Sequence, residues 1–138
     1  MLWIFDDGGR KAAGFRRRYG IGDCVPRSIA IAAQLPYRQV HEEIEQLAMM
    51  EERRGRRCPP DRGVNAFVAK RYLEILGWRF HLTNRAVLSE VHIPKGRLVA
   101  AIPRHFCAVI DHVVHDVDEP SARPARVRGY FAPIPLHP

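Results

Sequence analysis

The spacing of apolar residues changes at Gly77, and this change constrains the fold more than any other feature of the 138-residue chain. Before Gly77, apolar residues recur every three or four positions, which is typical of amphipathic helices. After Gly77 they alternate with polar residues or form short runs, which is typical of strands. The sequence therefore predicts an α+β domain in which N-terminal helices are followed by an antiparallel sheet.

The boundaries of the predicted elements follow from capping and turn residues. The first helix begins at Cys24, with Asp23 as its N-cap and Pro26 tolerated in its first turn. Pro36 opens the second helix, and Gly77 caps the end of the third. Strand-like runs follow at residues 78–82, 98–102, 106–110, 113–117 and 127–131, and residues 2–5 could form a further short strand.

Length and composition limit the class of protein. A chain of this length fits one domain spanning residues 1–138, in which we expect residues 132–138 to form an irregular tail. No apolar run approaches the roughly 18 residues of a membrane span, and residues 1–7 lack the basic start of a signal peptide. The chain holds three cysteines, an odd number that argues against a disulfide scaffold. We therefore expect a cytoplasmic protein with reduced cysteines and no membrane contact.

The net charge of +7 comes from 22 lysines and arginines against 15 acidic residues. Such a basic surface is compatible with a non-catalytic module that binds nucleic acid or an acidic partner through counterion release. No zinc-finger spacing and no aromatic-rich strand typical of RNA-binding domains accompanies the charge. This binding module is the alternative to the catalytic interpretation developed next.

Cys24 and His105 are the residues that most directly suggest chemistry. Cys24 lies at the predicted start of a helix, where the helix dipole and unpaired backbone N–H groups favour a thiolate. His105 opens a predicted strand some 80 residues later, and a cationic imidazole near the thiol would favour the thiolate further. The pair predicts a nucleophilic cysteine with a histidine base.

A hairpin after His105 supplies a third group. If Asp111-His112 is a two-residue turn, His112 must have a positive φ. The numbers of directly paired residues on the two strands then sum to 223. His105 then lies directly opposite Asp118 and diagonally opposite Asp116, with all three side chains on one face. Either aspartate could accept the imidazole N–H.

Three motifs together resemble the papain-like cysteine peptidase superfamily. They are Gly22-Asp23-Cys24 entering a helix of small residues, His105 leading an apolar strand, and Val114-His115-Asp116 in the next strand. The likeness is greatest to small bacterial and phage members and to Josephin-type and transglutaminase-like relatives. It covers residues 20–35 and 97–131.

The resemblance implies a papain-like core in which Cys24 is the nucleophile and His105 the general base and acid. It favours Asp116 over Asp118 as the residue that orients the imidazole. The implied activity is that of a cysteine-dependent hydrolase or acyl transferase, acting on an amide, peptide or related acyl bond through a thioester on Cys24. The substrate would be a peptide, a protein or a small amide, and no cofactor is implied.

The oxyanion donor departs from the superfamily pattern. Papain-like enzymes usually place a glutamine or similar donor five or six residues before the cysteine, where this chain has Tyr19 and Arg18. The candidate donors are therefore the Cys24 backbone N–H, the Tyr19 hydroxyl and Arg18. Trp78 could form an apolar wall for substrate, although a core position is favoured.

A metal site is the third interpretation of the hairpin. His105, Cys107 and Asp116 would share one face, and zinc accepts all three residue types. The cysteine and histidine spacings match no standard zinc motif, so we expect no bound metal.

Overall fold

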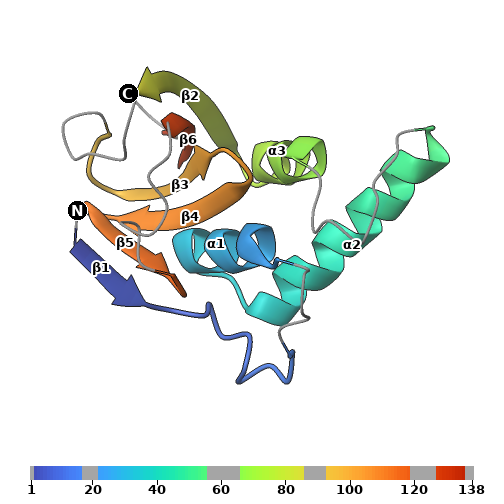
Figure 1. Ribbon diagram of the computed structural model, residues 1–138. Coiled ribbons are helices and arrows are strands. Elements are labelled where there is room, and N and C mark those ends of the chain that lie inside the picture. Colours follow the sequence, from blue (N-terminus) through green and yellow to red (C-terminus); the bar gives the residue numbers. More distant parts are fainter. Residues whose placement is uncertain (1, 17–21, 56–65, 86–92, 119–126, 136–138) are drawn as a thin grey trace.

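The computed structural model describes residues 2–16, 22–55, 66–85, 93–118 and 127–135, which form an α+β domain (Figure 1). The helices in these ranges are α1 (Cys24–Ala33), α2 (Tyr37–Arg53) and α3 (Ala66–Ile75). The strands are β1 (Leu2–Phe5), β2 (Trp78–Arg85), β3 (Arg97–Ile102), β4 (His105–Ile110), β5 (Val113–Asp116) and β6 (Val127–Pro133). None of the described helices is long and apolar enough to cross a membrane.

The six strands form one mixed sheet in the order β1-β5-β4-β3-β6-β2. The strands after the helices pair in antiparallel fashion as expected, but the sheet is mixed, because β1 precedes the helices and pairs in parallel with β5. A parallel pair needs a long crossover connection, so no turn signal in the sequence could reveal it. The other pairings are antiparallel, and β6 lies between β3 and β2.

The predicted helix ends agree with the structure where they are described. α1 begins at Cys24, and Gly77 follows α3 with a φ of 88°, the left-handed conformation expected of a glycine cap. Asp23 is at the N-cap position, yet its side chain makes no capping hydrogen bond. β6 continues through Pro133, so the chain is still regular where an irregular tail was expected from residue 132.

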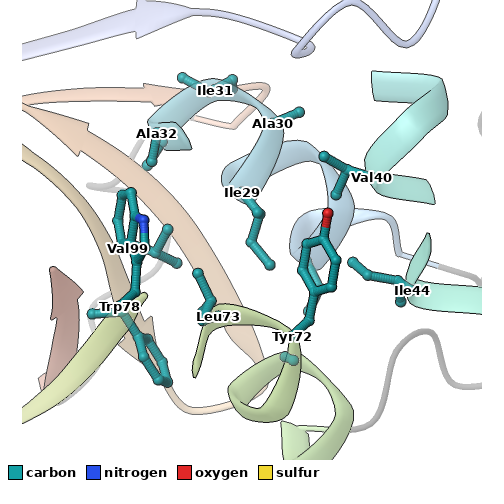
Figure 2. Packing of buried hydrophobic residues seen from close by; sticks show 14 of the residues in the cluster. Ile29, Ala30, Ile31, Ala32, Val40, Ile44, Tyr72, Leu73, Trp78 and Val99 are labelled. Atoms are coloured by element: carbon teal, nitrogen blue, oxygen red, sulfur yellow. The ribbon is translucent and has the colours of Figure 1, made fainter. Parts of the chain in front are cut away.

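α1 and α3 cover one face of the sheet, and α2 projects away from it (Figure 1). Between helices and sheet lies the main core, in which Ile29, Leu73 and Val99 are fully buried (Figure 2). Trp78 belongs to the same cluster and is only 7% exposed. Trp78 therefore has the core position that the sequence favoured over a role as a substrate wall.

The β4–β5 hairpin has the predicted register. Its pairs Ala108–His115, Val109–Val114 and Ile110–Val113 all sum to 223. The turn residues Asp111 and His112 have φ values of 48° and 66°, which is the two-residue turn that matches the twist of antiparallel strands. This register determines which side chains meet at the open end of the hairpin.

Candidate active site

Three element ends meet where β4 begins and β5 ends. Cys24 is the first residue of α1, His105 the first of β4 and Asp116 the last of β5. α1 packs mainly against β4, which brings its N-terminus to that end of the sheet. The structure therefore brings together the three residues that the sequence singled out.

His105 and Asp116 form a short, buried hydrogen bond. The distance from His105 Nε2 to Asp116 Oδ2 is 2.6 Å, and the two residues are 6% and 3% exposed. This contact is the diagonal cross-strand pairing expected from the hairpin register. Asp118, the other aspartate considered, lies two residues beyond the end of β5 and is half-buried.

Cys24 hydrogen-bonds to the His105 side chain and accepts a hydrogen bond from the backbone N–H of Phe106. Nε2 of His105 is engaged with Asp116, which leaves Nδ1 as the other ring nitrogen. Burial raises the pKa of the Cys24 thiol, but these hydrogen bonds and the charges of His105 and Arg27 outweigh it, so the pKa lies below its ordinary value. These interactions stabilise the thiolate form of Cys24 relative to the thiol.

The pKa of His105 is shifted in favour of the imidazolium cation. Burial alone would lower the pKa of His105, but hydrogen bonds with Asp116 and Cys24, together with their charges, raise it to about 9. The pKa of Cys24 is lowered while that of His105 is raised, and both shifts are in the direction that favours a thiolate–imidazolium pair.

Arg27 completes the environment of Asp116. Its Nη2 donates to Asp116 Oδ1 at 2.8 Å, and the Val117 backbone N–H donates to the same oxygen at 2.8 Å. Burial raises the pKa of Asp116, but the hydrogen bond and charge of His105, the charge of Arg27 and the Val117 N–H lower it below its usual range. Asp116 is thus held as a carboxylate with Oδ2 directed at the imidazole.

Arg27 also links Asp116 to a second carboxylate. Its other terminal nitrogen, Nη1, contacts Asp23 Oδ1, while the Tyr37 hydroxyl donates to Asp23 Oδ2 at 3.1 Å. Arg10 Nη1 lies 2.9 Å from the same oxygen. This network was not predicted from the sequence, although one signal was present: Asp23 and Arg27 are four residues apart, and Arg27 is the only lysine, arginine, aspartate or glutamate of α1.

The N-terminal segment closes the site from the β1 side. Trp3 Nε1–H and the Asp6 backbone N–H both donate to the Asp116 carbonyl oxygen at 3.1 Å. Gly8, with a φ of +69°, lies so close to Arg27 that an added Cβ would be 3.0 Å from the Arg27 carbonyl oxygen. The same added Cβ would be 3.3 Å from Arg27 Cγ, so the Gly8 backbone also packs against the aliphatic part of the Arg27 side chain.

Two of the predicted oxyanion donors, Arg18 and Tyr19, lie outside the described residues. The third, the Cys24 backbone N–H, is in the first turn of α1, where N–H groups have no acceptor within the helix. Cys107 is 3% exposed and packs in a second apolar cluster on the sheet, as expected for a core thiol. Cys24 and Cys107 are not joined to any disulfide in the described part of the chain.

The hairpin residues do not gather as metal ligands. No group of three histidine, cysteine, aspartate or glutamate side chains that could hold a metal ion occurs in the described ranges. His112 Nε2 instead lies 2.9 Å from the Ile93 carbonyl oxygen, and His115 Nδ1 lies 3.3 Å from Asp6 Oδ2. These two histidines have structural partners.

Comparison with models of protein families, with curated proteins and with solved structures finds no match to this chain. The site is therefore interpreted from its own residues and geometry.

Proposed function

We propose that this protein is a cysteine-dependent hydrolase or acyl transferase with a papain-like core, acting on an amide, peptide or related acyl bond. The observation that carries the proposal is the buried 2.6 Å contact between His105 and Asp116, with Cys24 hydrogen-bonded to the same imidazole. A helix-borne cysteine, a strand-borne histidine and an aspartate on the adjacent strand also follow the arrangement of the superfamily that the sequence resembles.

Each group has a defined part in the reaction. The Cys24 thiol gives its proton to His105 Nδ1, and the thiolate sulfur attacks the carbonyl carbon of the substrate. The imidazolium returns this proton to the leaving amine as the carbon–nitrogen bond breaks, which leaves a thioester on Cys24. Water or a second amine, deprotonated by His105, then attacks the thioester and releases the thiol. Asp116 keeps its negative charge throughout and stabilises the imidazolium.

The backbone supplies the remaining stabilisation. Negative charge develops on the substrate oxygen during attack, beside the nucleophile. The Cys24 N–H at the start of α1 is available as a donor to that oxygen, and the helix dipole favours an anion there.

The test is the pH dependence of Cys24 alkylation by iodoacetamide, followed by mass spectrometry. We expect Cys24 to react with a midpoint well below the ordinary thiol value of about 8.5, and ahead of the buried Cys107. His105→Ala should remove this advantage. His81→Ala is the matched control, because His81 is on β2, at the opposite edge of the sheet from β1.

A Cys24 that is inert, or that reacts identically in wild type and His105→Ala, would contradict the proposal. The alternative would then be a basic interaction module, tested by salt-dependent binding of the unmodified protein to nucleic acid or to an acidic protein.

A further inference from the structure

Arg27 is the only lysine, arginine, aspartate or glutamate in α1, and its side chain is buried. It is 4% exposed, and its neighbours in α1 include the core residues Val25 and Ile29. Removing a guanidinium from water is costly, and an apolar residue of similar volume often stabilises a fold at least as well. The position of Arg27 therefore calls for a role beyond packing.

We propose that Arg27 is a positioning residue of the active site, which holds Asp116 so that His105 is aimed at Cys24. This inference rests on the proposed function and extends it to a residue that touches neither substrate nor nucleophile.

The hydrogen bonds of Asp116 support this role. Arg27 and the Val117 N–H both occupy Oδ1, so Oδ2 alone remains for His105. With one oxygen held by two donors, the plane of the carboxylate is set, and the imidazole that donates to Oδ2 is oriented with it. Nδ1 of the same ring is then the nitrogen that exchanges a proton with Cys24 in the proposed mechanism.

The guanidinium fork is suited to this geometry. One terminal nitrogen of Arg27 bonds to Asp116 and the other to Asp23, so the group is anchored at a second point on the chain. A lysine has one nitrogen at the end of a flexible stem and cannot reproduce two separately directed contacts. The Arg27→Lys variant therefore separates charge from geometry.

The charges around the site are balanced. Arg10 and Arg27 offset Asp23 and Asp116, so the four permanent charges sum to zero whether or not a proton has moved from Cys24 to His105. The charge of Arg27 also contributes directly to the lowered pKa of the Cys24 thiol.

The experiment measures the midpoint pH of Cys24 alkylation in full-length wild type, Arg27→Met and Arg27→Lys, with folding checked by circular dichroism. We expect Arg27→Met to raise the midpoint by about one pH unit or more, which slows alkylation about tenfold at pH values below both midpoints. Arg27→Lys should raise it by a smaller amount. Arg71→Met, which removes the same charge from a half-exposed position on α3, should leave it unchanged.

The results separate this inference from the proposed function. If wild type shows the lowered midpoint and both folded Arg27 variants retain it, the positioning role is overturned while the proposed function stands. If Arg27→Met does not fold, Arg27→Lys alone decides, and a wild-type midpoint in that variant overturns the inference. A wild-type midpoint at the ordinary thiol value, independent of His105, instead overturns the proposed function.

Discussion

Replacing Asp116 with asparagine should reverse the proton arrangement of the site. The two side chains have the same shape, but asparagine has an NH₂ group in place of one oxygen. Arg27 and the Val117 N–H both donate to Oδ1, whereas only His105 faces Oδ2. The amide oxygen therefore takes the Oδ1 position, where it satisfies two donors, and the NH₂ group is turned toward Nε2 of His105.

The size of the expected effect follows from the pKa of the His105 imidazole. The hydrogen bond with Asp116 is the leading cause that raises the pKa of His105 from 6.5 to about 9, a difference of about 3 kcal/mol in favour of the cation. An NH₂ group facing Nε2 requires that nitrogen to accept, which moves the ring proton to Nδ1. The neutral ring can then no longer take the proton of Cys24. We expect the pKa of His105 to fall below 6.5 and that of Cys24 to return toward about 8.5.

Two assays follow this change. Nitrogen NMR of labelled protein reports the tautomer and the titration of His105, and iodoacetamide alkylation reports the thiolate of Cys24. At pH 6.5 a thiol with a pKa near 8.5 is about 1% ionised, so Asp116→Asn should slow alkylation by up to about 100-fold. Asp118→Asn makes the same chemical change at the other aspartate and should leave His105 near 9. A titration midpoint of His105 that stays near 9 in Asp116→Asn, or that falls only in Asp118→Asn, would refute this reasoning.

Two further predictions concern stability. Gly8→Ala should lower the free energy of unfolding by about 1–3 kcal/mol more than Gly14→Ala, because both glycines have positive φ but only Gly8 meets a neighbour, the Arg27 carbonyl oxygen. Equal losses in urea titrations would argue against this close approach. In a Cys24→Ala chain, the free energy of unfolding should fall by about 1–2 kcal/mol as pH rises from 6.5 to 10, measured relative to Cys24→Ala/His105→Gln. Folding raises the pKa of His105, so the stabilisation by the His105 cation is complete below pH 6.5 and is lost as pH rises through the pKa of the folded state. An equal decline in both chains would contradict the assignment of this effect to His105.

Local signals predicted much of this structure. The start of α1 at Cys24, the cap at Gly77 and the β4–β5 register each depend on residues close together in the sequence. The register was enough to place Asp116 diagonally opposite His105, because alternation in strands and a two-residue turn leave little freedom.

Contacts between residues far apart in the chain could not be predicted from the sequence. β1 pairs with β5, which lies more than 100 residues later in the chain. Residues 2–5 carry no turn or periodic signal that identifies this partner. Arg27 was missed for a related reason. Its spacing from Asp23 is visible in the sequence, but its contact with Asp116 depends on how α1 lies across the sheet.

The start of α1 shows why a capping rule can fail at a candidate active site. Asp23 is a preferred N-cap residue, and a side-chain cap usually adds about 0.5–2 kcal/mol. Pro26 lacks an N–H, so the only backbone donor left for such a cap would be that of Val25, beside the nucleophile. Asp23 instead bonds to Arg27 and Tyr37, and makes no capping bond. A capping carboxylate would place a negative charge where the proposed reaction develops an oxyanion, and two anions there would repel each other. Under the proposed function, diverting Asp23 into the arginine network therefore both stabilises Arg27 and keeps the helix N-terminus available to the substrate.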